Sequence, residues 1–231
     1  MPVVSTRAAV CLLDRFPALA GVDLDVEAGD VVLLTGANGA GKTTLLRMLA
    51  ALVPLRSGRA VVCGHDLTRA PRAVRRQVGL VGHETFCYDD LTVRENLEFA
   101  ARAAHRPVGG AHAALDHLGL GEVADVVHSR LSAGQRRRLS IAVALARSPE
   151  LLLLDEPHAG LDADGRDVVD GIVATAAAEG RTVLLASHEH ERARRLASRE
   201  VQVVAGRLVG GVVDAAPASG AAVPGDVEVG A

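Results

Sequence analysis

Aromatic residues are scarce in this chain: they make up 2% of its 231 residues, and tryptophan is absent. Proteins that bind single-stranded nucleic acid stack the bases on aromatic side chains, so this scarcity argues against that function. The formal net charge of −3 argues against a nucleic-acid partner more generally, because such a surface needs an excess of positive charge. Since 49% of the residues are hydrophobic, we expect a substantial core of leucine, valine and alanine.

Long apolar runs are also missing. No stretch reaches the roughly 18 apolar residues that span a bilayer, and the N-terminus lacks the charged and apolar segments of a signal peptide. Cysteines are few: Cys11, Cys63 and Cys87 are odd in number and form no C-x-x-C pair, which favours a reduced, intracellular chain. The sequence therefore predicts that any action on a membrane takes place through another chain.

Lysine is nearly absent. Lys42 is the only lysine, and the other 24 basic residues are arginine. It lies in Gly-Ala-Asn-Gly-Ala-Gly-Lys-Thr-Thr at 36–44, which matches the G-x-x-x-x-G-K-[ST] pattern of a phosphate-binding loop. An ammonium is a compact charge that fits among curled backbone N–H groups, whereas an arginine fork is wider and planar. The apolar run 31–35 predicts a strand before the loop and 44–50 predicts a helix after it, the context that this motif requires.

Short apolar runs predict an α/β fold. The runs 151–154 and 183–186 are continuous, as in central strands of a parallel sheet that is covered on both faces. Other expected elements are an alternating strand ending near residue 26, a strand pair over 58–67, a short strand over 77–81, a mainly helical stretch over 88–148 that is broken at 107–110, and a hairpin over 201–213 with Gly206 at its turn. The composition beyond 214 predicts a disordered tail, with a docked final segment as the alternative.

Two acids, Asp155 and Glu156, follow the apolar run 151–154. In a parallel sheet, a carboxylate at this strand end lies beside the phosphate loop and can hold Mg²⁺ through water, because Mg²⁺ prefers oxygen ligands. The second acid can orient and deprotonate an attacking water. Without a phosphate loop, such a pair would indicate an ordinary solvated turn.

The segment Leu-Ser-Ala-Gly-Gln at 131–135 precedes an arginine-rich helix. Ser132 and Gln135 have the spacing of a capping box, which would make them a plain helix start. A helix N-terminus is also a site for phosphate, so the same residues can bind a nucleotide. We expect the arginines at 136–138 to form a solvated surface. His188 follows the run 183–186, where it is either a loop residue or a donor to a γ-phosphate oxygen.

Taken in their order along the chain, these motifs resemble those of ATP-binding cassette ATPases. They are the phosphate loop, the segment at 131–135, the run ending in Asp-Glu-Pro, the Gly-Leu-Asp turn at 160–162 and His188. The resemblance covers about residues 3–210, and the segment at 131–135 separates this family from kinases and GTPases. It implies a P-loop NTPase core with a mostly parallel sheet, an N-terminal antiparallel β subdomain and a helical signature subdomain over about 84–150. The nucleotide-binding domain would extend over 1–214, followed by the tail at 215–231.

The resemblance implies ATP and Mg²⁺ as cofactors and a dimer that holds ATP between its subunits. Each site would combine the phosphate loop of one subunit with Ser132, Gly134 and Gln135 of the other. The roles implied within one subunit are contact with the β- and γ-phosphates for Lys42, magnesium ligation for Thr43 and Asp155, general base for Glu156, and γ-phosphate contact for His188. Gly36, Ala37, Asn38, Gly39, Ala40, Gly41 and Thr44 would complete the loop, and Asp162 would lie at the dimer seam.

One candidate for adenine stacking and one departure from the family pattern remain. Phe16 would stack on adenine, but its spacing to Gly36 is short, and a phenylalanine in a loop or in the core is the alternative. His83 lies where most members carry a glutamine that reaches the Mg²⁺ region and the membrane partner. Because neutral imidazole is a poor ligand for this hard ion, we expect His83 to act through water or in coupling alone.

The Gly-His pair at 82–83, followed by an acid and by Leu-Thr-Val-Arg-Glu-Asn-Leu at 91–97, is similar to the heme exporter ATPases of the cytochrome c maturation system. This resemblance implies an ATPase subunit at the cytoplasmic face of the cell membrane, in contact with the membrane only through integral permease subunits. The coupling surface would lie over 83–100. The alternatives are the ATPase of a drug, lipid or polysaccharide exporter, a soluble cassette acting on DNA or ribosomes, and a non-catalytic nucleotide sensor.

Overall fold

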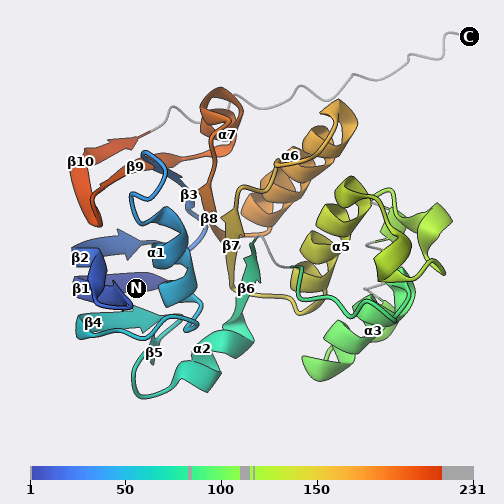
Figure 1. The fold of residues 1–231 in the computed structure, drawn as a ribbon, viewed down its shortest axis with the longest axis horizontal. Coiled ribbons are helices and arrows are strands. Elements are labelled where there is room, and N and C mark those ends of the chain that lie inside the picture. The colour runs from blue at the N-terminus through green and yellow to red at the C-terminus, as the bar shows by residue number, and fades with distance from the viewer. Residues whose placement is uncertain (1, 83–84, 110–114, 117, 215–231) are drawn as a thin grey trace, which may run out of the picture.

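The computed structural model describes residues 2–82, 85–109, 115–116 and 118–214, with side chains described up to residue 209. The expected tail at 215–231 and the position of His83 lie outside the described residues. Within the described part, two β-sheets and the helices packed on them form the fold (Figure 1).

A four-stranded antiparallel sheet contains the N-terminal strands, in the order β2-β1-β4-β5. Its strands are β1 (Val4–Leu13), β2 (Phe16–Val26), β4 (Ser57–Val62) and β5 (His65–Asp66). β1 pairs with β2 on one side and with β4 on the other. The alternating pattern that predicted a strand up to residue 26 therefore corresponds to β2.

The larger sheet has six strands in the order β10-β9-β3-β8-β7-β6. They are β3 (Val31–Thr35), β6 (Val78–Val81), β7 (Leu151–Asp155), β8 (Thr182–Ala186), β9 (Arg199–Val204) and β10 (Arg207–Asp214). All neighbours run parallel except β9 and β10, which form the expected C-terminal hairpin. Every residue of β3 and β8 is buried, as their continuous apolar composition predicts. The α/β fold class with an antiparallel sheet and a mostly parallel one is confirmed.

Helices cover both faces of the larger sheet (Figure 1). The helices with described bounds are α1 (Lys42–Leu49), α2 (Pro71–Gln77), α3 (Val93–Ala103), α5 (Ala133–Ala146), α6 (Ala163–Ala178) and α7 (His190–Leu196), of which α3 packs against α5. α1 lies between the two sheets, where Leu45 and Met48 are buried in one cluster with residues from both. On the other face, Val173 of α6 and Ala193 of α7 pack against the same strands.

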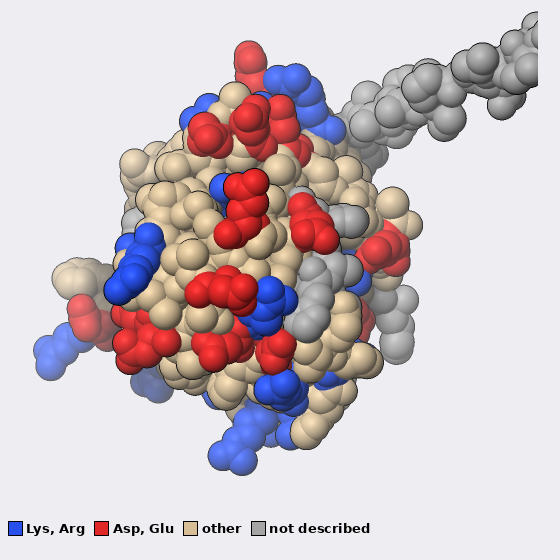
Figure 2. Space-filling model, turned by 90° about the vertical axis from the view of Figure 1, so that its right-hand side faces the viewer, with Lys and Arg blue, Asp and Glu red and all other residues tan. Residues whose placement is uncertain are grey.

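A third hydrophobic cluster lies on the side of the molecule where α3 and α5 pack together (Figure 1). Leu97 of α3 and Leu139 of α5 are fully buried in it. On the surface of this side, acidic side chains are spread with arginines between them (Figure 2). Two arginines of α3 pair with acids, in the ion pairs Arg94–Asp125 and Arg102–Glu98.

The sequence patterns missed α2, α6 and α7. Two of these helices are seven residues long and rich in arginine, so no apolar periodicity marks them. α6 contains Gly165 and Gly171, and glycine weakens a helix pattern. The helical stretch expected over 88–148 is also less regular than predicted, because 3₁₀ turns at Gly121–Val123 and His128–Arg130 separate α3 from α5.

No helix in the described part of the chain combines the length and the hydropathy that crossing a bilayer requires. The three cysteines are free thiols. Burial raises the pKa of Cys63 to about 12 and that of Cys11 to about 11, so neither thiol supplies a thiolate nucleophile near neutral pH.

Candidate functional site

The predicted phosphate loop at 36–44 connects β3 to α1 through an unusual backbone. Gly36, Gly39 and Gly41 have φ values of 138°, 75° and 113°, which residues with a Cβ atom rarely adopt. The chain therefore curls tightly between the strand and the helix. Such a curl turns successive backbone N–H groups inward, the geometry that binds phosphate.

This loop is held against the β9–β10 hairpin and β2. A Cβ atom added to Gly36 would lie 2.1 Å from the carbonyl oxygen of Val203 in β9. At the hairpin turn, the N–H of Gly206 donates to the carbonyl of Ala40 at 2.8 Å, and the Gly206 carbonyl accepts from the N–H of Ala20 at 2.8 Å. The C-terminal hairpin thus supports the loop, a relation that no local pattern predicts.

Replacing Gly36 with alanine is expected to destabilise the fold by about 2–5 kcal/mol, through backbone strain and the clash with Val203. Gly171→Ala is the matched control, because Gly171 lies inside α6 with open space around its Cα. There alanine should stabilise the helix by about 0.5–1 kcal/mol. Urea unfolding of both variants measures the difference, and equal stabilities would contradict this account of the loop.

Lys42 is the first residue of α1 and is only 7% exposed. Its ammonium donates to the carbonyl oxygen of Gly36 at 2.6 Å and to that of Ala37 at 3.2 Å. The side chain therefore folds back over the loop instead of extending into solvent. Its charge adds to the positive end of the helix dipole, so this position strongly favours an anion.

Asp155, Glu156 and His188 meet where β7 and β8 end. The backbone N–H of Glu156 donates to the carbonyl of Ala186 at 2.8 Å, and Glu156 has a φ of 50°, a strained value of the kind found at functional sites. Its carboxylate accepts the backbone N–H of His188 at 3.0 Å, and its other oxygen lies 3.4 Å from the His188 Nε2 atom. Tertiary structure thus pairs the second acid with the histidine.

One cavity of about 440 Å³ joins the loop, the acids and the histidine. Its lining residues are Leu13, Ala18, Asn38, Gly39, Ala40, Gly41, Lys42, Thr43, Thr44, Arg47, Asp155, Glu156 and His188. Most residues predicted for the phosphate end of the site therefore share one cavity. The structure adds Arg47 and Ala18 to its wall, which the sequence patterns did not mark.

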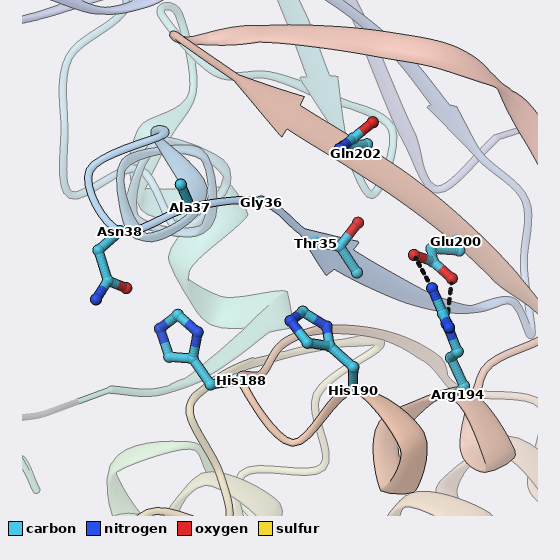
Figure 3. A pocket seen from close by; sticks show the side chains of 9 residues that line it. All are labelled: Thr35, Gly36, Ala37, Asn38, His188, His190, Arg194, Glu200 and Gln202. Carbon is cyan, nitrogen blue, oxygen red and sulfur yellow. Dashed lines mark hydrogen bonds and ion pairs between the residues drawn. The ribbon is translucent and has the colours of Figure 1, made fainter.

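A second cavity of about 560 Å³ adjoins the first, because Asn38 and His188 line both. The remaining residues of its wall are Thr35, Gly36, Ala37, His190, Arg194, Glu200 and Gln202 (Figure 3). Arg194 and Glu200 form a two-point ion pair at 2.8 and 3.1 Å. Arg194 is the main cause of the lowered pKa of the Glu200 carboxyl, which favours the ionised form of this side chain.

Phe16 lies outside the first cavity. It is the first residue of β2 and is 79% exposed, so the alternative of a core phenylalanine is wrong. Its cross-strand partner Leu13 lines the cavity instead. The wall on this side of the cavity is therefore made by the end of β1, and the stacking role of Phe16 remains a prediction.

The capping box predicted at the start of α5 is confirmed. The Ser132 hydroxyl accepts the N–H of Gln135 at 3.2 Å, and the Gln135 side chain accepts the N–H of Ser132 at 2.8 Å. Ser132, Gly134 and Gln135 do not line the cavity of their own chain. Asp162 likewise caps α6, accepting the N–H of Gly165 at 2.9 Å.

The expectation of a solvated surface for the arginines at 136–138 is wrong. All three are partly buried and donate to backbone carbonyls. Arg137 reaches the carbonyls of Asp155 and Glu156 at 2.6 and 2.5 Å. A run of three arginines looks uniform in sequence, so only the packing of α5 against the end of β7 distinguishes Arg137.

A sequence profile of the ABC transporter family matches residues 19–159, which is more than half of the chain. The chain belongs to the ABC transporter family. The matched range contains the phosphate loop, the helix start at Ser132 and the acidic pair. The chain is therefore an ATP-binding cassette, a class of ATPase domain.

The cassette is similar to drug-resistance proteins of Streptomyces. It is 42% identical over 198 residues to the daunorubicin resistance ATP-binding protein DrrA2 of Streptomyces coeruleorubidus, covering 83% of this chain and 61% of that protein. It is 38% identical over 214 residues to the daunorubicin/doxorubicin resistance ATP-binding protein DrrA of Streptomyces peucetius, covering 89% of this chain and 64% of that protein. The cassette thus spans less than two thirds of the length of these relatives.

Among solved structures, the fold resembles the dimeric cassette MJ0796 in a post-hydrolysis state bound to ADP and phosphate. The TM-score is 0.85 at 23% identity, with 92% of this chain and 99% of that chain covered. At this identity the likeness concerns the fold alone.

The motif at 91–97, one of the two clues to a heme exporter, has a structural role in the cassette. Thr92 and Glu95 form a capping box at the start of α3, with bonds of 3.2 and 2.8 Å. Asn96 is 3% exposed, and its amide donates to the carbonyls of Tyr88, Leu91 and Thr92. Because these residues build a helix start, they carry little information about cargo.

The residues at the loop end of the cavity fit Mg²⁺. Thr43 offers a hydroxyl, and Asp155 and Glu156 offer carboxylates, so the available donors are mainly the oxygen atoms that this hard ion prefers. The half-buried Asp155 lies at the strand end facing the loop, in register with Ala186 of β8.

Proposed function

We propose that this cassette binds and hydrolyses ATP to power a membrane exporter. The observation that carries the proposal is the single cavity in which Lys42, Asp155, Glu156 and His188 meet. The loop N–H groups, the ammonium and the N-terminus of α1 all attract a polyphosphate. Two adjacent carboxylates then supply one group for a metal ion and one for the attacking water.

Each side chain has a distinct task in this reaction. Lys42 contacts the β- and γ-phosphates from its place over the loop. Glu156 orients the attacking water and accepts its proton, and the N–H of His188 at 3.0 Å keeps the carboxylate pointed toward the cavity. His188 donates from its ring to a γ-phosphate oxygen. When bound by Thr43 and Asp155, Mg²⁺ would offset the phosphate charge.

The cassette is proposed to act as a dimer. Ser132 is exposed at the N-terminus of α5, where the helix dipole favours phosphate, yet it lies outside its own cavity. A second copy would bring its Ser132, Gly134 and Gln135 over the bound nucleotide. Asp162, at the N-terminus of α6, would then lie near the seam. The likeness to a dimeric cassette supports this arrangement.

A drug or related small molecule is the proposed cargo of the exporter. The relatives named for daunorubicin resistance favour this alternative over the heme exporter of cytochrome c maturation. His83, the sharper clue to heme, lies outside the described residues, and the motif at 91–97 is explained by the start of α3.

The permease is proposed to dock on an aromatic patch made of Phe86, Tyr88 and Phe99. These side chains are 55%, 53% and 48% exposed, and the rings of Tyr88 and Phe99 stack edge to face at 5.0 Å. Exposed aromatic residues are typical anchors of protein interfaces. The patch lies within 83–100, the expected coupling surface.

A Tyr88→Ser/Phe99→Ser variant is expected to lose at least about tenfold of its retention on the permease, because aromatic anchors dominate interface energy. Co-purification from membranes measures the retention. Leu52→Ser is the control, since Leu52 is similarly exposed at 49% but lies outside the patch. Equal retention of both variants would move the docking surface elsewhere.

Phosphate release from ATP by the purified cassette tests the proposed hydrolysis. We expect release that requires Mg²⁺ and rises when membranes carrying the permease are added. No release under either condition would overturn the proposal. Identification of the co-purified membrane subunit, with drug-binding and heme-absorption measurements, decides the cargo.

A further inference from the structure

Arg137 connects three parts of the cassette that are far apart in sequence. Its guanidinium donates to the carbonyl of Asp155 at 2.6 Å, of Glu156 at 2.5 Å and of Pro157 at 3.2 Å, and also to the carbonyl of Gly82. Gly82 directly follows β6, and the other three carbonyls form the end of β7 and the turn after it. Arg137 itself lies on α5, five positions after Ser132.

These contacts hold the charged guanidinium of Arg137 where the protein shields it from water. Burial lowers the pKa of the Arg137 guanidinium, and the nearby charges of Asp155 and Glu156 oppose that effect. A planar fork with five N–H donors can satisfy several carbonyls at once, whereas an ammonium cannot match that geometry. The site therefore specifically suits an arginine.

The same contacts hold the backbone of Glu156 at both ends. Its N–H is bonded to the carbonyl of Ala186 at 2.8 Å, and its carbonyl accepts from Arg137 and from the N–H of Ala159 at 3.1 Å. Because Glu156 also has a strained φ of 50°, these bonds over-determine a conformation that the residue would not otherwise keep. The direction of its carboxylate follows from this backbone.

We propose that Arg137 is a positioning residue that couples the orientation of α5, and so of the Ser132 helix start, to the orientation of the Glu156 carboxylate in the same subunit. This inference rests on the proposed function. When Ser132 engages the nucleotide of the second subunit, α5 shifts. The hydrogen bonds of Arg137 then move the turn at 155–157 together with α5. Closure of the dimer then fixes a carboxylate direction that the N–H of His188 already favours within one subunit.

Two substitutions test the coupling. Arg137→Met removes the fork, and Arg137→Lys keeps the charge but not the fork. We expect kcat for ATP to fall on the order of 10²-fold in Arg137→Met, the scale of a misplaced catalytic group, and by about tenfold in Arg137→Lys. The Kd for ATP should stay close to that of the unchanged protein, because the phosphate loop is untouched.

Arg136→Met is the matched control. Arg136 precedes Arg137 on α5, and its guanidinium reaches the carbonyl of Ser129 at 2.9 Å, so its loss should leave kcat unchanged. Thermal unfolding reports whether each variant folds. A folded Arg137→Lys protein with kcat within about twofold of normal would overturn the proposal, as would a parallel rise in Kd and fall in kcat. Failure of both Arg137 variants to fold would assign the residue to folding alone, which also overturns it.

Hydrolysis by the unchanged cassette distinguishes a failure of the proposed function from a failure of the Arg137 proposal. If the unchanged cassette hydrolyses ATP and Glu156→Gln abolishes hydrolysis, the proposed function stands whatever the Arg137 variants do. If the unchanged cassette and its membrane complex release no phosphate, the proposed function fails first.

Discussion

Replacing Glu156 with glutamine is expected to lower the turnover of ATP by about 10²–10⁴-fold, the usual contribution of a general base. The amide keeps the shape of the side chain, so the N–H of His188 retains an acceptor, but it cannot take a proton from water. ATP should still bind, because Lys42 and the loop are unchanged. Phosphate release and ATP affinity, measured on the same sample, check both expectations, and sizing chromatography should detect a dimer that persists with ATP.

Glu150→Gln is the matched control for this prediction. Glu150 directly precedes β7, whereas Glu156 directly follows it, so the two acids lie at opposite ends of one strand. The Glu150 side chain is exposed and lines neither cavity near the loop. Its neutralisation should therefore leave turnover unchanged. A Glu156→Gln protein that hydrolyses ATP at the normal rate would remove Glu156 from the base role.

Lys42→Met should weaken ATP binding by about 10–100-fold, the value of one or two hydrogen bonds to a charged group. Turnover should become undetectable, because the charge that opposes the γ-phosphate is gone. Lys42→Arg should not restore it, since the wider fork does not fit among the loop carbonyls that the ammonium contacts at 2.6 and 3.2 Å. Titration with ATP and an assay of phosphate release measure the two effects.

Arg75→Met serves as the control for the lysine variants. Arg75 is also a basic residue bonded to a backbone carbonyl, that of Ala51 at 3.2 Å, but it lines neither of the cavities beside the loop. Because Lys42 is the only lysine, an amine-reactive reagent offers a second measurement. ATP should protect this one side chain from modification, and labelling that ATP does not slow would contradict the assignment.

Local patterns in the sequence predicted the elements that need only neighbouring residues. β3, β7 and β8 follow from continuous apolar runs, and the start of α5 follows from the Ser132–Gln135 spacing, because a cap is made within one helical turn. α2 and α7 escaped because short arginine-rich helices have no clear apolar period. α6 escaped for a similar reason, since its glycines interrupt the pattern.

Residues that act across the fold were harder to predict. The family resemblance implied Phe16 at the adenine, whereas Leu13 of the neighbouring strand lines the cavity, and no local pattern marks Leu13. Arg137 was assigned to solvent because its two arginine neighbours look the same in sequence. Its partners lie at 82 and 155–157, and they are brought together only when β6 and β7 pair beside α5.

The sequence alone determined three features: a phosphate loop that follows a buried strand, two acids at the end of another strand, and a capped helix start that lies between the loop and the acids along the chain. It could do so because each feature depends on spacing within a few residues. Tertiary structure alone decided that the carboxylate of Glu156 meets the backbone N–H of His188, that the β9–β10 hairpin supports the loop, and that Arg137 joins α5 to the acidic turn. The physical reason is that such contacts depend on the order of strands in the sheet and on the packing of helices against it, and one-dimensional periodicity records neither.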